Sequence, residues 1–293
     1  VKAYILITLS INKIYNIKSN STVTIEDVAY HLNKQILLAL KYTAKEENDV
    51  EKLTEQAEKD TVTFLKKIPD VRAMLETDLE AAFQGDPAAK YRDEIILSYP
   101  GMFAITVNRL AHELFLLEVP LIPRIMTEYA HSITGIDIHP GATIGKGLFI
   151  DHGSGVIIGE TAILGDNITL YQGVTLGGTG KEQGKRHPTL EDNVMVSAGA
   201  KVIGSFTIGK NSKIGAGSVV IEEVPPNCTV VGVPGRIVRM GDQKVPSADL
   251  DQIHLPDPVL NDIRQLQTDN IRLKKELKAL KEKLAKEKII EEA

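Results

Sequence analysis

Residues 137–162 read DIHPGATIGKGLFIDHGSGVIIGETA, and this stretch decides the fold of the chain. A small aliphatic residue recurs in it every six positions, and the same spacing continues downstream. A period of six fits neither an α-helix nor a coiled coil, and the region is rich in Gly, Val, Ile and Thr, which favour strands and turns. The recurring positions are Ile138, Ile144, Ile150, Val156, Ala162, Ile168 and Val174, then Leu190, Val196, Val202, Ile208, Ile214 and Val220. Three six-residue units make one triangular coil, so thirteen units predict a parallel β-helix of a little over four coils.

Ten residues, at about 180–189, interrupt this spacing within GTGKEQGKRHPT. The register of the repeat requires them to loop out of the coil. A loop on a rigid solenoid costs little closure entropy and is a common place for function. The segment carries Arg186 and His187, its most reactive side chains.

The sequence upstream of the repeats has helical periodicity. Apolar residues recur at four-residue spacing in residues 28–40, and Gly85 is placed to end a later helix. Asp86 and Pro87 follow as a predicted N-cap and first-turn proline of the next helix. We therefore expect residues 1–135 to form an all-α domain.

The C-terminal region carries a heptad pattern. Apolar positions alternate spacings of four and three, with Asn270 at an a position, where an amide fixes register and oligomeric state. The full set is Val259, Ile263, Leu266, Asn270, Leu273, Leu277, Leu280 and Leu284. The fold class is thus α+β multidomain: an all-α domain (1–135), a parallel β-helix (136–240), a linker (241–258) and a C-terminal coiled-coil helix (259–293).

Composition excludes several classes of protein. The 293 residues carry a net charge of -5 and a pI near 5.9, so neither nucleic acid nor an anionic membrane surface is an expected partner. The apolar stretch at residues 3–11 is too short to span a bilayer. One cysteine, Cys228, excludes an intramolecular disulfide framework and fits a cytoplasmic location.

Specific motifs within and around the repeats carry a resemblance to a known family. They are DIHPGATIGKGLFIDHGSGVIIGETA, YQGVTLGGTGKEQGKRHPTLEDNV, KIGAGSVV, and upstream GDPAAKYRDEIILSYPG and LIPRIMTEYAHS. Together they resemble the serine O-acetyltransferases of cysteine biosynthesis over roughly residues 65–239. The resemblance implies a left-handed β-helix, an exception to the usual right-handed crossover. It also implies transfer of an acetyl group from acetyl-CoA to the hydroxyl of L-serine.

The resemblance implies a catalytic pair. His152, in the DHG motif, is the expected general base, since an imidazole with an ordinary pKa of about 6.5 can accept the hydroxyl proton. Asp137, in DIHP, would orient it. Fourteen residues lie between the two, somewhat less than one coil of eighteen, so they can approach around neighbouring corners. A backbone N–H near Gly178 could stabilise the oxyanion.

The same resemblance implies contacts to both substrates. For serine, Asp86 and Asp151 would hold the ammonium group, while Arg186 and His187 would hold the carboxylate. For acetyl-CoA, lying in a groove between neighbouring β-helices, the expected contacts are small residues and cations: Gly178, Ala198, Lys213, Ala216, Gly217, Arg236 and Arg239. No metal is expected.

Partners and rival functions follow from the same features. The repeats and coil indicate a homotrimer, and the helical domain a dimer of trimers; both assemblies stay open. L-cysteine is the expected feedback inhibitor. Relatives dock on O-acetylserine sulfhydrylase through a tail ending in isoleucine, whereas this sequence ends IIEEA, so that partner is doubtful. The alternatives are an acetyltransferase acting on homoserine or a sugar, a γ-carbonic-anhydrase-like zinc enzyme, and a non-catalytic scaffold. The zinc enzyme would need a close C-terminal histidine pair, a spacing that His139, His152 and His187 do not show.

Overall fold

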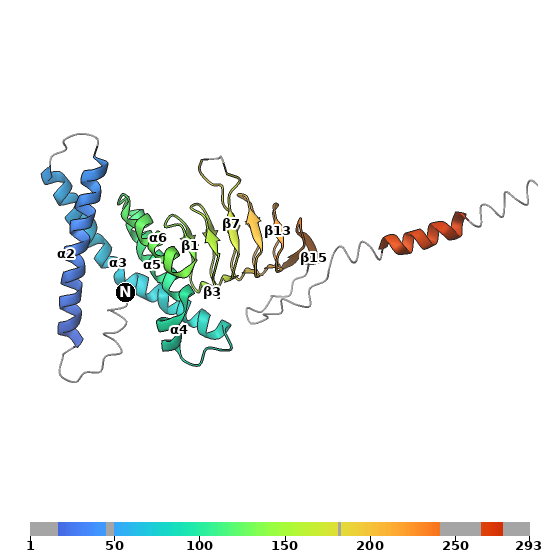
Figure 1. The fold of residues 1–293 in the computed structure, drawn as a ribbon, viewed down its shortest axis with the longest axis horizontal. Coiled ribbons are helices and arrows are strands. Elements are labelled where there is room, and N and C mark those ends of the chain that lie inside the picture. Colours follow the sequence, from blue (N-terminus) through green and yellow to red (C-terminus); the bar gives the residue numbers. More distant parts are fainter. Residues whose placement is uncertain (1–16, 45–49, 181–182, 241–264, 278–293) are drawn as a thin grey trace, which may run out of the picture.

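The chain forms a helical domain followed by a left-handed parallel β-helix (Figure 1), in a computed structural model that describes residues 17–44, 50–180, 183–240 and 265–277. The helices are α2 (Ile17–Thr43), α3 (Val50–Gly85), α4 (Arg92–Ser98), α5 (Pro100–Leu116) and α6 (Ile122–Thr134). A further helix covers 265–277. The predicted fold class, with its helical N-terminal region, β-helix and C-terminal helix, is confirmed.

The helical domain is organised by the apolar stripe of α3. Ala57, Phe64 and Val71 lie seven residues apart and are buried, as expected for one face of a helix. The next member of this series is Asp78, a carboxylate that is 0% exposed. α3 therefore carries one ionisable side chain where its pattern calls for an apolar one.

The β-helix consists of three parallel sheets whose strands follow each other in turn along the chain. Sheet A contains β1 (Asp137–Ile138), β4 (Ile157–Ile158), β7 (Thr175–Gly177), β10 (Lys201–Ile203) and β13 (Val219–Val220). Sheet B contains β2 (Thr143–Ile144), β5 (Ile163–Leu164), β8 (Thr189–Leu190) and β11 (Thr207–Ile208). Sheet C contains β3 (Phe149–Asp151), β6 (Thr169–Tyr171), β9 (Met195–Val196), β12 (Lys213–Ile214), β14 (Cys228–Val231) and the antiparallel β15 (Arg236–Met240).

The strand register differs from the predicted six-residue repeat, which was unbroken from Ile138 to Val174. Ile150 pairs with Leu170 and Ile138 with Ile158, so the first coil has twenty residues rather than eighteen. The two additional residues lie at the turn from β3 to β4, which contains His152. With that shift, Leu164 pairs with Leu190, and the predicted ten-residue interruption becomes eight additional residues between β7 and β8. Thr189, placed in the loop by the sequence, belongs to β8.

Two of the three corners of the β-helix repeat a backbone conformation with positive φ. At the corner between sheets B and C, four asparagines adopt φ of 57–60° and their side chains form a hydrogen-bonded ladder of 3.2, 3.1 and 2.9 Å; they are Asn167, Asn193, Asn211 and Asn227. Asparagine tolerates this left-handed conformation. At the corner between sheets C and A, glycines with positive φ serve instead: Gly155, Gly173, Gly199 and Gly217. This second corner thus exposes bare backbone.

A buried ion pair joins the helical domain to the first coil. Arg109 on α5 donates from Nε and Nη2 to the two carboxylate oxygens of Asp78, at 2.6 and 2.8 Å, and to the carbonyls of Ile144 and Gly145. Asp78 Oδ1 also accepts the backbone N–H of Leu148 at 2.9 Å. Helix α3, helix α5 and the β2–β3 turn are therefore held by one charged pair.

The chain around Asp86 differs from the prediction. Asp86 and Pro87 do not begin a helix, because α4 starts at Arg92 with Tyr91 as its N-cap. Asp86 Oδ1 instead accepts the backbone N–H of Ala88 at 2.8 Å and closes a turn. The second oxygen of Asp86 is left for other contacts.

The C-terminal heptads are described only in part. The helix at 265–277 includes Leu266, Asn270, Leu273 and Leu277, and its three leucines are more than half exposed. The remaining heptad positions lie outside the described residues. The coiled coil itself stays a prediction.

Asp78→Asn should strongly destabilise the protein. The substitution leaves the Arg109 guanidinium buried without a counter-charge, for which a cost of about 3–5 kcal/mol in the free energy of unfolding is typical. Urea denaturation measures it. Glu76→Gln, which breaks the exposed pair with Arg72, is the control and should change stability by less than about 1 kcal/mol. Equal changes in the free energy of unfolding for the two substitutions would disprove the stabilising role of the Asp78–Arg109 pair.

Candidate active site

His152 lies at the turn between β3 and β4, where the first coil carries its two additional residues. It has φ of 57°, a conformation that a non-glycine residue rarely adopts without a functional or structural reason. Its side chain is 73% exposed, and its Nε2 lies 4.0 Å from Asp151 Oδ1. The strained turn therefore projects an imidazole from the corner between sheets C and A into solvent.

Asp151 stands beside this imidazole, and a second carboxylate, that of Asp86, acts on Asp151. Burial raises the pKa of Asp151, His152 opposes the rise, and the charge of Asp86 adds to it. Asp86 thus comes from the helical domain and Asp151 from β3, and their negative charges repel each other. Such a pair is a suitable site for a cationic group.

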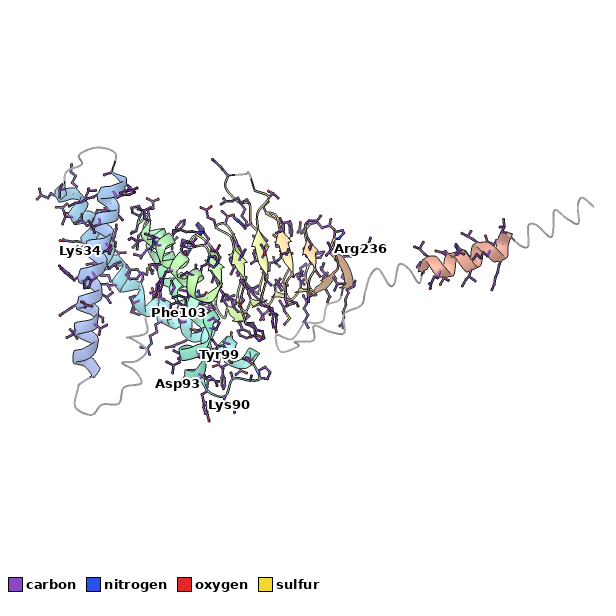
Figure 2. All side chains as sticks on the ribbon, viewed as in Figure 1. Lys34, Lys90, Asp93, Tyr99, Phe103 and Arg236 are labelled. Atoms are coloured by element: carbon purple, nitrogen blue, oxygen red, sulfur yellow. The ribbon has the colours of Figure 1, made fainter. Side chains whose placement is uncertain are left out.

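Tyr99 lies in the motif GDPAAKYRDEIILSYPG but was given no role from the sequence. Its hydroxyl donates to Asp86 Oδ2 at 2.5 Å. That hydrogen bond, with burial and the charge of Asp86, raises the pKa of Tyr99 to about 12. Figure 2 shows Tyr99 on the helical domain close to the first coil. Both oxygens of Asp86 are therefore held in place, by Ala88 and Tyr99.

Asp137 lies at the same corner, at the start of β1. The N–H of Gly155 donates to the Gly135 carbonyl at 2.8 Å, which brings the His152 turn against the segment before Asp137. Among the described residues, however, the carboxylate within 4.0 Å of His152 is that of Asp151. The carboxylate of Asp137 instead lies within 4.8 Å of the ligand atoms of Glu128 and His131 on α6.

Among the residues that the structure describes, one cluster has donor atoms close enough to hold a metal ion, and it consists of Glu128, His131 and Asp137. Glu128 is already paired with Arg124 on the same helix and lies 3.5 Å from His131 Nδ1. A positive guanidinium beside the group opposes the binding of a cation.

Arg186 and His187 lie at another corner, between sheets A and B, in the loop that leaves the β-helix after β7 (Figure 1). Arg186 forms an ion pair with Glu160, with both side chains about one-third exposed. His187 is buried against Gly159, where an added Cβ would lie 2.0 Å from its ring. Burial and then the charge of Arg186 lower the pKa of His187.

The expected serine contacts therefore fall into two groups. The acidic group with His152 lies at the corner between sheets C and A, and the basic group at the corner between sheets A and B. Within one chain, sheet A lies between them. The structure places the members of each group together and does not unite the two groups in a single copy.

The expected acetyl-CoA contacts are also divided. Ala198, Ala216 and Gly217 lie at the corner between sheets C and A, in line with His152, and Gly178 lies beside Arg186 and His187. Lys213, expected to meet a phosphate, is 7% exposed in β12. Arg236 and Arg239 are exposed on β15, and Figure 2 shows Arg236 at the far end of the β-helix from the helical domain.

Comparison with known proteins defines first a class and then a family. Residues 187–222 match the model of bacterial transferase hexapeptide repeats. The serine acetyltransferase of Bacillus subtilis is 50% identical over 211 residues, covering 72% of this chain and 97% of the relative. The chain belongs to the serine acetyltransferase family and is an acyltransferase. This membership decides against the carbonic-anhydrase-like and scaffold alternatives.

Solved structures agree. That of Neisseria gonorrhoeae serine acetyltransferase in complex with serine has a TM-score of 0.58 at 38% identity, covering 72% of this chain and 82% of that one. The serine acetyltransferase 1 of Entamoeba histolytica, in complex with L-cysteine, has a TM-score of 0.68 at 35% identity, covering 79% and 86%. No helix within the described residues has the length and apolarity needed to cross a membrane.

Asp86→Asn should lower the pKa of Tyr99 toward 10, because the anionic acceptor of its hydroxyl is lost. With a pKa of about 12, Tyr99 is mostly protonated at pH 11. Absorbance at 295 nm and pH 11 should therefore show about one additional tyrosinate in the variant. Asp93→Asn, which changes an exposed carboxylate of α4 (Figure 2), is the control. Identical titrations of both variants would refute the contact.

Proposed function

We propose that this chain transfers the acetyl group of acetyl-CoA to the hydroxyl of L-serine, giving O-acetylserine and CoA, as the first step of cysteine biosynthesis. The observation that carries the proposal is the pair of repelling carboxylates, Asp86 and Asp151, beside an exposed imidazole. An amino-acid ammonium group would relieve that repulsion and bring the substrate hydroxyl to His152. The solved relative with serine supports serine over homoserine or a sugar as the acceptor.

The proposed reaction needs one base and no covalent enzyme intermediate. His152 takes the proton of the serine hydroxyl while the oxygen attacks the thioester carbonyl of acetyl-CoA. The tetrahedral intermediate collapses, the carbon–sulfur bond breaks, and the CoA thiolate receives the proton from His152. Asp137, at the same corner, orients and stabilises the imidazolium. A backbone N–H near Gly178 is the proposed oxyanion donor.

The carboxylate of serine is assigned to Arg186 and His187. Because these residues lie at a different corner from His152, a complete site takes the corner between sheets C and A of one copy and that between sheets A and B of a second. Three copies related by a threefold axis close such a ring with three equivalent sites. We therefore propose a homotrimer, with a dimer of trimers as the alternative assembly.

The same arrangement suggests where acetyl-CoA and an inhibitor bind. The groove between copies is bordered by Ala198, Ala216 and Gly217, whose small side chains let a pantetheine chain lie against the backbone. Arg236 and Arg239 are exposed and can meet phosphates, whereas Lys213 is buried in the single chain. L-cysteine, which has a thiol where serine has a hydroxyl, is the proposed feedback inhibitor, as the cysteine-bound relative suggests.

Location and the sulfhydrylase partner remain expectations from the sequence. Cys228 is a buried free thiol, in keeping with the proposed cytoplasmic location. The C-terminal residues that would meet O-acetylserine sulfhydrylase lie outside the described part of the chain.

His152→Asn should reduce kcat by about 10²–10⁴-fold, because it removes the base. Release of CoA thiol from acetyl-CoA and L-serine measures the rate. His31→Asn, an exposed histidine paired with Asp27 on α2, is the control and should retain full activity. Near-normal turnover of the His152 variant would disprove the assigned base.

Arg186→Lys should raise the KM for L-serine about tenfold and leave the KM for acetyl-CoA unchanged. Lysine keeps the charge but cannot bind a carboxylate through a planar fork of N–H donors. Steady-state kinetics with each substrate varied in turn measures both constants. An unchanged serine KM would remove Arg186 from the carboxylate site.

A further inference from the structure

Thr161, to which neither the sequence motifs nor the mechanism assign a role, holds the loop that carries Arg186 and His187. Its Oγ1 accepts the backbone N–H of Arg186 at 3.0 Å and that of His187 at 3.2 Å. Its carbonyl oxygen accepts a hydrogen bond from Lys185 Nζ at 2.7 Å. One residue on the coil therefore fixes three consecutive residues of the loop.

Thr161 also determines which nitrogen of His187 carries the proton. The backbone N–H of Thr161 donates to His187 Nδ1 at 3.1 Å. An amide N–H can only donate, so Nδ1 has to be the unprotonated nitrogen of a neutral ring. Thr161 Oγ1 lies 2.9 Å from the same nitrogen, and its own hydrogen is free to point at Nδ1 because both backbone bonds use its lone pairs. The proton of the neutral imidazole therefore lies on Nε2.

The surroundings of the His187 ring leave Nε2 as the nitrogen that can donate to a substrate. The imidazole lies between Gly159, whose added Cβ would be 2.0 Å from Cδ2, and Gly178, whose added Cβ would be 3.3 Å from Nε2. The residue is 9% exposed. Within the described residues both hydrogen bonds of the ring are made by Nδ1, so the Nε2–H has no acceptor there and is left for a substrate.

We propose that Thr161 is a positioning residue that holds His187 in its Nε2–H tautomer and so aims a single neutral N–H donor at the carboxylate of the amino-acid substrate. The proposal rests on the function proposed above. It deepens that function by adding a residue from the coil itself to the recognition of the substrate. Thr161 acts through His187 and the loop backbone and does not touch the substrate.

The charges around the loop support this arrangement. Burial and Arg186 lower the pKa of His187, so the ring stays neutral near pH 7 and can accept from Thr161. Arg186 is held by Glu160, the residue next to Thr161, and donates from Nη1 to the Gly184 carbonyl at 3.4 Å, which leaves its other N–H groups for a carboxylate. A charged donor from Arg186 and a neutral donor from His187 are thus presented side by side by two adjacent residues after β4.

Substitutions of Thr161 test whether its hydroxyl positions Arg186 and His187 for the binding of serine. Thr161→Val keeps the shape of the side chain and removes Oγ1, while Thr161→Ser restores the hydroxyl. We expect Thr161→Val to raise the KM for L-serine about tenfold with kcat and the KM for acetyl-CoA within twofold of wild type. Thr161→Ser should return the serine KM to within twofold. A serine KM unaffected by Thr161→Val overturns the proposal.

The tautomer can be observed without turnover. In the full chain labelled with 15N-histidine, NMR correlation of ring nitrogens with carbon-bound protons distinguishes an Nε2–H from an Nδ1–H ring, and His187→Gln identifies the resonance. Wild type should show His187 as Nε2–H. Thr161→Val keeps the backbone N–H but removes the hydroxyl that holds the backbone of Arg186 and His187, so the ring should leave that N–H and become a mixture of the two forms. An Nδ1–H ring in wild type, or an unchanged ring in Thr161→Val, overturns the proposal.

The two readouts keep this proposal apart from the proposed function. Should wild type release no CoA with L-serine while His187 is Nε2–H in wild type and mixed in Thr161→Val, the acceptor is wrong and Thr161 still sets the tautomer. Should wild type be active and the kinetics of Thr161→Val match it, the enzyme assignment stands and the role of Thr161 is refuted. Circular dichroism and the melting temperature of both Thr161 variants verify that the fold is retained.

Discussion

The pairing of each coil with the next is the constraint on which the rest of the structure depends. Strands of two or three residues are too short to be stable alone, so each is stabilised by parallel neighbours and by an aliphatic side chain stacked inside the prism. This stacking fixes the position of every residue relative to its equivalents in the coils before and after it. A departure from the repeat is therefore forced outward, because the interior has no room for an additional residue. The described coils gain residues at the His152 turn and at the loop carrying Arg186 and His187, and the last coil loses two residues between β13 and Val224.

The first two departures divide the chemistry by charge. The turn after β3 gathers carboxylates around an imidazole, and the loop after β7 carries a guanidinium and a second imidazole. An amino acid has both charges on one small skeleton, so its recognition needs both groups within a few ångströms. The triangular cross-section of one chain keeps them apart. Association of copies is therefore part of forming the proposed site, in addition to whatever stability it confers.

The sequence predicted the fold well because the repeat is local. A six-residue period is visible without knowing any long-range contact, and it located the inward positions of the first coil and of the coils after the loop. Between Val156 and Val174 the predicted positions are buried in the core as expected, but the spacing did not show the two additional residues at the His152 turn, through which Ile138 pairs with Ile158 and not with Val156. The contacts of Asp78 with Arg109 and of Asp86 with Tyr99 join residues 31 and 13 positions apart, and no motif indicates such pairs. Tyr99, Glu160 and Thr161 lie in the same quoted motifs as the predicted site residues, but only the geometry shows that they hold those residues in place.

The way those supporting residues act explains why a rigid solenoid suits this chemistry. A histidine in a loop can place its proton on either nitrogen, and a donor that is present half of the time is a poor recognition element. Thr161 is on the coil, so its amide and hydroxyl keep fixed positions, and the glycines on both sides of the ring allow the imidazole to lie against that backbone. Asp86 is treated in the same way, with one oxygen held by a backbone N–H and the other by a phenol. In both cases a side chain with two alternative hydrogen-bonding states is held in one of them before the substrate binds. Less side-chain entropy is therefore lost when a small substrate binds.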